Sequence, residues 1–279
     1  MSENCSGSCG SCSSCSSCDS CGEDKLAKKM GSISRKIMVL SGKGGVGKST
    51  VSASLAVTLA AQGRKVGLLD ADFHGPSQPT LFGVNHLRLE GDENGNILPL
   101  ELECGVNLVS VGLLIEDSDQ AVVWRGPAKM AVLKQLIEET NWGELDDLIL
   151  DFPPGTGDES LSACQLITGE KCAIVVTTPQ EMSLADCRKC IDFCGKLDVP
   201  IAGIVENFAG FVCPDCGKRH ELFASGGGKG LSEKYSLPLL AQLPIDPVFM
   251  AKCDAGNIAT ALKESTVGKE IENVAAVLR

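Results

Sequence analysis

From Arg35 onward, the chain alternates short apolar runs with longer segments whose apolar residues recur at helical spacing. Continuous apolar runs predict buried strands, and these cover residues 36–42, 65–72, 147–154, 172–179, 201–208 and 237–244. Helices are predicted from Lys48 to a stop at Gly63, and over residues 128–140, 158–168, 183–197, 247–255 and 266–278. Apolar strands that alternate with helices are typical of parallel sheets covered on both faces. The pattern therefore predicts an α/β fold with a doubly wound, mostly parallel sheet.

The first 35 residues lack this periodicity and consist largely of Ser, Gly and Cys, so they cannot build a core. We expect a disordered, Cys-rich tail over residues 1–35, ahead of one domain over residues 36–279. Overlapping Cys-x-x-Cys pairs in the tail favour an N-terminal iron–sulfur site, with nonspecific metal capture or simple low-complexity sequence as alternatives. The candidate ligands are Cys9, Cys12, Cys15, Cys18 and Cys21.

Composition narrows the class of protein further. The 279 residues carry a formal net charge of −11 and only 4% aromatic residues, which argues against nucleic acid as the main partner. No run of about 18 apolar residues predicts a membrane span, and the first residues lack a secretory signal pattern. We therefore expect a cytoplasmic protein with no membrane partner. In a reducing compartment, 15 cysteines favour metal binding over disulfides.

A glycine-rich stretch, "SGKGGVGKST", follows the first predicted strand and opens the first predicted helix. From Gly42 to Ser49 it matches the phosphate-loop pattern, in the context that this motif requires. Its backbone N–H groups would cradle phosphate oxygens, Lys48 would reach the β- and γ-phosphates, and Ser49 would bind Mg²⁺. The predicted nucleotide-binding residues are Gly42, Lys43, Gly44, Gly45, Val46, Gly47, Lys48, Ser49 and Thr50.

Carboxylates at strand ends are the expected partners of Mg²⁺ and of the attacking water. Asp72 ends "LLDAD" and Asp151 ends "LILD", so both are predicted catalytic residues, together with Lys48. Asp151 directly follows an apolar run, which places it at the edge where parallel sheets bind ligands. Asp70 and Asp158 are weaker candidates.

The stretch "FVCPDCGKRH" holds Cys213 and Cys216 one tight turn apart, which is half of a tetrahedral sulfur site. A second such pair does not lie nearby in the sequence. A structural zinc site that adds His220 is one possible completion, because the spacing suits zinc. Three further cysteines, at positions 187, 190 and 194, fall on one face of a predicted helix, which is typical of small core residues.

Taken in order, "SGKGGVGKST", "LLDADFHGPSQP", "DLILDFPPGTGD", "VTTPQEMSLAD", "GIVENFAGFVCPDCGK" and "AQLPIDP" resemble the Mrp/ApbC-type iron–sulfur cluster carrier ATPases. These are deviant phosphate-loop NTPases related to MinD, ParA and the nitrogenase iron protein, and the resemblance covers about residues 33–278. It implies a homodimeric ATPase that holds a [4Fe–4S] cluster and passes it to apoproteins. It further implies that Lys43 acts catalytically by reaching the partner subunit's nucleotide, and that Asn207 contacts the adenine.

A homodimer would complete the half site, because a two-fold axis brings two copies of Cys213 and Cys216 together as four thiolates. Two other functions stay open at this point. One is a MinD- or ParA-like spatial organiser. MinD-like action would need a basic amphipathic C-terminal helix, whereas the C-terminal "GKEIENVAAVLR" carries both basic and acidic side chains and only a short apolar part. The other is an electron donor like the nitrogenase iron protein. The cluster cysteines of that protein lie apart in its chain, whereas Cys213 and Cys216 are close together here.

Overall fold

The computed structural model describes residues 26–114, 126–213, 216–223 and 226–278. The predicted tail ligands between residues 9 and 21 lie outside these ranges. Within them, no helix is long and apolar enough to cross a membrane.

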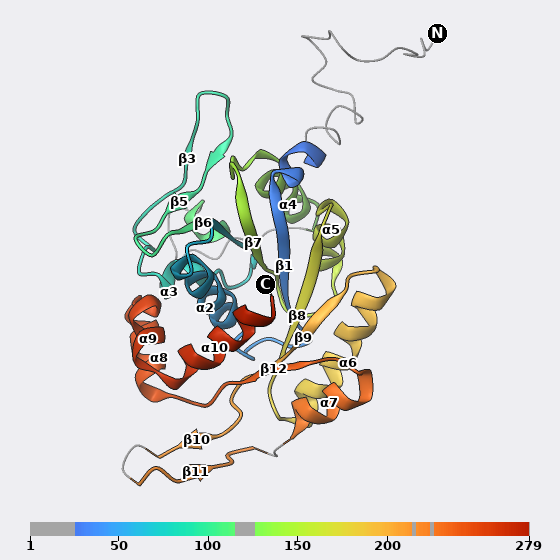
Figure 1. Cartoon of the computed structure of the whole chain (residues 1–279). Coiled ribbons are helices and arrows are strands. Elements are labelled where there is room, and N and C mark those ends of the chain that lie inside the picture. The colour runs from blue at the N-terminus through green and yellow to red at the C-terminus, as the bar shows by residue number, and fades with distance from the viewer. Residues whose placement is uncertain (1–25, 115–125, 214–215, 224–225, 279) are drawn as a thin grey trace.

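The centre of the molecule is an eight-stranded sheet with the order β12-β9-β8-β1-β7-β2-β6-β5 (Figure 1). Neighbouring strands pair in parallel except for β5, which runs antiparallel to β6 at the edge. The predicted doubly wound, mostly parallel sheet is confirmed. The strands are β1 (Ile33–Ser41), β2 (Val66–Asp70), β5 (Leu100–Glu101), β6 (Val106–Ser110), β7 (Leu145–Asp151), β8 (Lys171–Thr177), β9 (Ile201–Glu206) and β12 (Leu239–Gln242).

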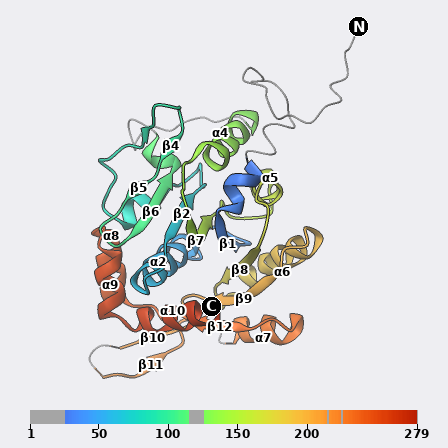
Figure 2. The ribbon, with the colours of Figure 1, turned by 45° about the horizontal axis from the view of Figure 1, so that its top comes forward.

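Helices cover both faces of this sheet (Figure 2). One face carries α2 (Lys48–Ala61), α8 (Pro247–Asp254), α9 (Ile258–Glu264) and α10 (Thr266–Val277). The other face carries α4 (Gly126–Glu139), α5 (Asp158–Leu166), α6 (Glu181–Lys196) and α7 (Gly227–Tyr235). The smaller elements are α3 (Gln78–Leu81), η1 (Val111–Leu113), β3 (Glu90–Gly91), β4 (Ile97–Leu98), β10 (Phe211–Val212) and β11 (Arg219–His220).

Strand β1 feeds the two cores alternately, as the two-residue period of a strand requires. Met38 and Leu40 pack into the core under α4, α5 and α6, whereas Ile37 and Val39 pack into the core under α2 and α10. All four side chains are at most 1% exposed. The central strand is therefore fixed from both faces, and its carboxyl end is a rigid base for the loop that follows.

The folded part begins earlier than residue 36. A helix over residues 26–31 buries Leu26 and Met30, which lie four residues apart on one face, in the core. β1 itself starts at Ile33, so the predicted boundary between residues 35 and 36 falls inside this strand.

A buried ion cluster joins β1 and β7 near their amino ends to the residues that precede β2. The Asp147 carboxylate is fully buried, accepts a hydrogen bond from Arg35 Nε at 2.8 Å, and pairs with Arg64. Loss of Asp147 would leave both guanidinium groups without their counter-charge, whereas loss of either arginine would leave the carboxylate with one cation. The cluster fixes the amino ends of β1 and β7, leaving the opposite end of the sheet for chemistry.

Candidate nucleotide and metal site

The predicted phosphate loop connects the end of β1 to the start of α2. Gly45 and Gly47 have φ angles of 76° and 85°, a left-handed conformation that glycine adopts without strain. Gly47 is the residue before α2. Because glycine has no side chain to cap the helix, the first backbone N–H groups of α2 remain available to a ligand in the loop. A helix N-terminus of this kind attracts anions such as phosphate.

Two glycines also allow close packing beneath the loop. A Cβ atom on Gly42 would lie 2.2 Å from the backbone carbonyl carbon of Asp186 in α6. A Cβ atom on Gly47 would lie 2.1 Å from the amide nitrogen of Asn207. The loop therefore rests directly on α6 and on the end of β9.

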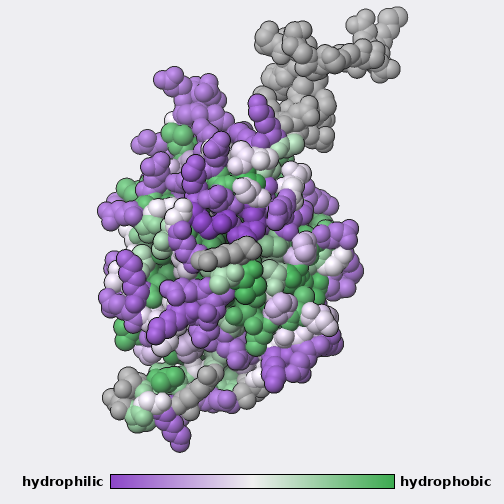
Figure 3. All heavy atoms as spheres, in the orientation of Figure 1, coloured by the Kyte–Doolittle hydropathy of each residue, from purple (hydrophilic) through white to green (hydrophobic). Residues whose placement is uncertain are grey.

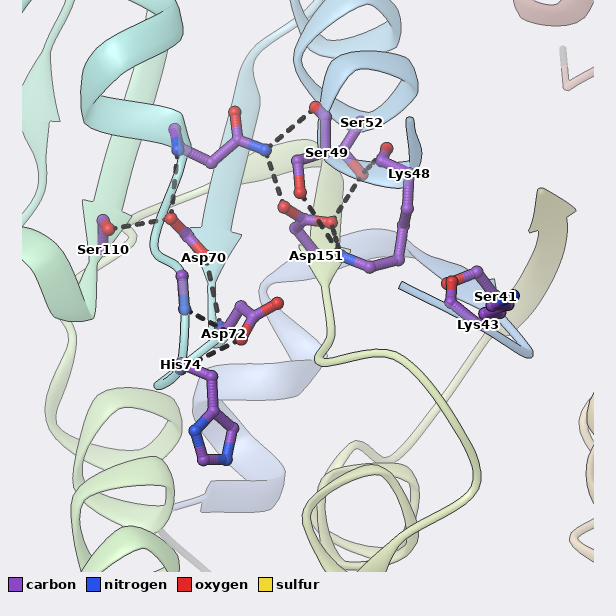
Figure 4. Close-up of polar contacts among 12 residues, drawn as sticks. Ser41, Lys43, Lys48, Ser49, Ser52, Asp70, Asp72, His74, Ser110 and Asp151 are labelled. Atoms are coloured by element: carbon purple, nitrogen blue, oxygen red, sulfur yellow. Dashed lines mark hydrogen bonds and ion pairs between the residues drawn. The ribbon is translucent and has the colours of Figure 1, made fainter. Parts of the chain in front are cut away.

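Lys48, the first residue of α2, forms a buried ion pair with Asp151 at the end of β7 (Figure 4). Ser52, one turn further along α2, donates to the same Asp151 oxygen, Oδ1, at 3.1 Å. Lys48 Nζ also lies 3.4 Å from the hydroxyl of Ser49. Three predicted site residues, Lys48, Ser49 and Asp151, are thus brought together.

Asp70 lies beside Asp151, because β2 and β7 are neighbours and the two residues are partners in the register. Both carboxylates are fully buried, and Ser110 Oγ donates to Asp70 Oδ2 at 2.9 Å. Burial, together with the negative charge of Asp151, raises the pKa of Asp70 to about 7. Asp70 therefore carries a proton more readily than an ordinary aspartate does.

Asp72 lies in the turn after β2 rather than on the strand, so the predicted strand over residues 65–72 extends two residues beyond the end of β2 at Asp70. Its Oδ1 accepts hydrogen bonds from the backbone N–H of His74 at 3.0 Å and of Gly75 at 3.3 Å. The side chain is half-buried and stays near the site (Figure 4). The sequence made Asp70 a weaker candidate than Asp72. In the structure, however, Asp70 is the carboxylate that directly neighbours Asp151.

These residues fit a nucleotide with Mg²⁺. Mg²⁺ prefers hard oxygen ligands, and Ser49, Asp70 and Asp151 supply a hydroxyl and two carboxylates at one edge of the sheet. Lys43 is exposed and lies to one side of this group, with its backbone carbonyl accepting from Ser41 Oγ at 3.0 Å (Figure 4).

Asn207 links the phosphate loop to the segment that follows β9. Its backbone N–H donates to Thr177 O at 2.8 Å, and its side-chain amide donates to Val46 O at 2.9 Å. Phe208 and Gly210 then adopt positive φ angles of 58° and 121°, which turn the chain out of the sheet. The predicted strand over residues 201–208 accordingly ends at residue 206.

The turned segment leads into a hairpin formed by β10 and β11, which projects at the lower end of the molecule in Figure 1. The Cys213 N–H donates to Lys218 O at 3.0 Å, and Gly217 N–H donates to Cys213 O at 2.9 Å, which closes the tip. Cys213 is half-buried and Cys216 is exposed. Hydrophobic side chains also reach the surface here (Figure 3), among them Val212 at 48% and Leu222 at 55% exposure.

Among the described residues, no three His, Cys, Asp or Glu side chains gather as metal ligands. His220 pairs across the hairpin with Phe211, so it does not complete a three-ligand zinc set with Cys213 and Cys216. The hairpin of one chain therefore offers two thiols.

Comparison with known proteins gives the family. A family model described as "NUBPL iron-transfer P-loop NTPase", of the ParA group, matches residues 32–279. The chain belongs to this family. The resemblance inferred from the motifs is confirmed.

Two relatives of the iron-transfer NTPase and one solved structure illustrate the match. The "Iron-sulfur cluster carrier protein" of Saccharolobus solfataricus is 45% identical over 252 residues, which are 90% of this chain and 85% of that protein. The "Cytosolic Fe-S cluster assembly factor NUBP2 homolog" of Culex quinquefasciatus is 46% identical over 247 residues, covering 87% and 96%. A nucleotide-binding protein from Archaeoglobus fulgidus, solved in complex with ADP, has a TM-score of 0.75 at 36% identity, covering 85% and 92%.

In the part of the chain that the structure describes, most of the cysteines outside the hairpin lie in the interior. Cys187, Cys190 and Cys194 on α6 are each 1% exposed and belong to a core cluster, as their spacing predicted. Burial raises the pKa of the Cys187 thiol, and it raises that of Cys164 on α5 to about 11. The Cys187 and Cys164 thiols are therefore poor nucleophiles and poor metal ligands, because their thiolate form is disfavoured.

Proposed function

We propose that the chain is an ATP-binding and ATP-hydrolysing carrier that holds a [4Fe–4S] cluster between two copies and passes it to apoproteins. Cys213 and Cys216 of each copy would bind the cluster. The observation that supports this best is the path of the chain after β9. Asn207 is bonded to the phosphate loop, and the short segment 208–212 leads directly from it to Cys213.

Nucleotide binding would begin with an exchange of partners by Lys48. Its ammonium group is paired with Asp151, and it would turn to the β- and γ-phosphates, while the loop N–H groups would donate hydrogen bonds to the phosphate oxygens. Ser49, Asp151 and Asp70 would hold Mg²⁺, which neutralises charge that develops on the transferred phosphoryl group. Asp72 would orient the attacking water, and Lys43 would reach the nucleotide of the partner subunit.

The thiol pair is incomplete in one chain, which supports a site shared by two. A two-fold axis places identical surfaces face to face, and four thiolates complete the ligand set of a cubane cluster. Since Cys216 is exposed at the tip of the hairpin, the cargo would remain accessible to an acceptor protein.

Coupling between the two sites would run through Asn207. An adenine contact at this side chain competes with its hydrogen bond to Val46. Loss of that bond would free the segment 208–212, and with it the orientation of the hairpin. ATP state and cluster exposure would thereby become linked.

We place the activity in the cytoplasm, with apo iron–sulfur proteins as the recipients of the cluster. The names of relatives, which include a cytosolic assembly factor, support this location. A second cluster on the tail cysteines stays a prediction, because those residues lie outside the described ranges.

Anaerobic reconstitution tests the proposal. Iron that wild type binds beyond the content of a variant lacking residues 1–25 belongs to the tail. That variant should bind about four iron and four sulfide per dimer at the hairpins, with charge-transfer absorption near 400 nm, and it should run as a dimer by light scattering. In that background, C213S/C216S should lose the iron and the transfer to an apo-[4Fe–4S] enzyme, whereas C104S should retain both. A monomer carrying the full iron content, or zinc in place of iron, contradicts the proposal.

A further inference from the structure

Gln78, which no sequence motif singles out, lies at the centre of the nucleotide site. It is the first residue of α3 and is fully buried. Its side-chain nitrogen Nε2 donates to Asp151 Oδ2 at 2.8 Å and to the backbone carbonyl of Ser49 at 3.0 Å. One amide therefore contacts both the strand-end carboxylate and the first turn of α2.

The backbone of Gln78 adds a third contact. Its N–H donates to Asp70 Oδ2 at 3.2 Å, so this residue bridges the two neighbouring carboxylates, Asp70 through its main chain and Asp151 through its side chain. α3 follows the turn that carries Asp72. Gln78 thus ties that turn to the end of β7.

The contacts of Asp151 indicate what Gln78 does when Lys48 leaves. Lys48 and Ser52 both contact Oδ1, whereas Gln78 contacts Oδ2. Once the lysine turns to a phosphate, Ser52 still holds Oδ1 and Gln78 still holds Oδ2. The Asp151 carboxylate would then keep the same orientation while Mg²⁺ takes the place of the Lys48 ammonium group.

Packing alone does not account for a glutamine here. Its carbonyl oxygen Oε1 is buried and accepts no hydrogen bond within the described part of the chain. A buried, unpaired amide oxygen costs free energy, so Leu or Met would fill the same space at lower cost. A glutamine is favoured over Leu or Met at this position only if its side-chain NH2 group has a function.

We propose that Gln78 is a positioning residue that fixes the orientation of Asp151 for Mg²⁺ and links it to the turn carrying Asp72. The inference rests on the proposed function in that this site hydrolyses ATP. It assigns Gln78 no direct contact with the reacting atoms.

The test compares Q78M, which keeps the volume and removes the amide, with Q135M, an exposed glutamine on α4 bonded to Glu139. Binding of a fluorescent ADP analogue is titrated with Mg²⁺, and ATP turnover is measured separately. For Q78M, the Mg²⁺ midpoint should rise roughly tenfold, as for loss of one hydrogen bond to a charged group. Nucleotide affinity in EDTA should not change, and kcat should fall while KM for ATP stays within about threefold. Q135M should match wild type.

Q78L covers the case in which Q78M does not fold, because leucine fills similar space and likewise cannot donate to Asp151. Its Mg²⁺ midpoint should rise as far. An unchanged midpoint in the folded variant overturns the role of Gln78. If wild type hydrolyses no ATP, the proposed function fails, whereas the Mg²⁺ titration of ADP binding still decides the role of Gln78.

Discussion

The side-chain amide of Asn207 donates to the carbonyl oxygen of Val46 at 2.9 Å, which bonds the end of β9 to the phosphate loop. Gly47 permits this contact, because any Cβ atom there would collide with the same amide. The nucleotide site and the cysteine hairpin are therefore adjacent along the chain and joined in space.

Replacing Asn207 with alanine should weaken nucleotide binding about tenfold, since the expected contact between its side-chain amide and the adenine is lost. Titration with a fluorescent ATP analogue measures the change. N257A is the control, because Asn257 is exposed and donates only to the nearby Ala255 O. Equal affinities for the two variants would refute the adenine role.

Gly42 and Gly44 offer a matched pair within the loop. A methyl group at Gly42 meets the α6 backbone at 2.2 Å, whereas at Gly44 its nearest neighbour is Pro154 Cγ at 3.7 Å. G42A should therefore lose about 1–3 kcal/mol of stability and most of its nucleotide affinity, because neither backbone can move cheaply. G44A should stay within about 0.5 kcal/mol of wild type. Chemical denaturation distinguishes them, and similar losses would show that the α6 contact is unimportant.

Most of the architecture could be predicted from the sequence. Helix α10 was expected over residues 266–278 and spans Thr266–Val277, because its apolar period is clear. Strand β6 was missed. Its five residues, Val106–Ser110, have no period of their own, and their place is set by pairing with β2, which is distant in the chain.

The site was also predicted only in part, because some of its residues are placed by contacts with residues that are distant in the chain. Lys48 and Asp151 belong to recognisable patterns, and they meet. Asp70 ends an apolar run just as Asp151 does, so that signal was present in "VGLLD" but was outweighed by the later Asp72. Gln78 has no local signal, since its contacts depend on how α3 folds back over β2 and β7.

Asp70 should make stability depend on pH. Its pKa is about 7 in the folded chain against an ordinary value of 3.8, so the unfolded chain releases this proton first as pH rises. The stabilisation is therefore present near pH 4 and is lost by about pH 7, amounting to at most about 4 kcal/mol. D70N removes the titration.

The unfolding free energy of D70N, relative to wild type, should accordingly rise between pH 4 and 8. Urea denaturation in EDTA at several pH values measures this difference. Parallel curves for the two proteins would contradict a raised pKa at this position.

Lys48 should matter to the nucleotide-free protein as well as to hydrolysis. K48M leaves Asp151 buried without its cation, which should cost about 3–5 kcal/mol, and it should reduce ATP turnover at least about a hundredfold. Adding D151N removes the uncompensated charge, so stability should largely return while turnover does not. Additive losses in the double variant would show that the two side chains are not coupled.

The seclusion of the α6 thiols has a consequence for a protein that handles iron. A carrier that retained its cargo on internal ligands would compete with its own recipients. Because Cys187, Cys190 and Cys194 are shut inside the core, incoming metal cannot be diverted to them without unfolding the chain. Among the described cysteines, Cys216 is the exposed one, so under the proposed function the cluster would enter and leave at the tip of the hairpin.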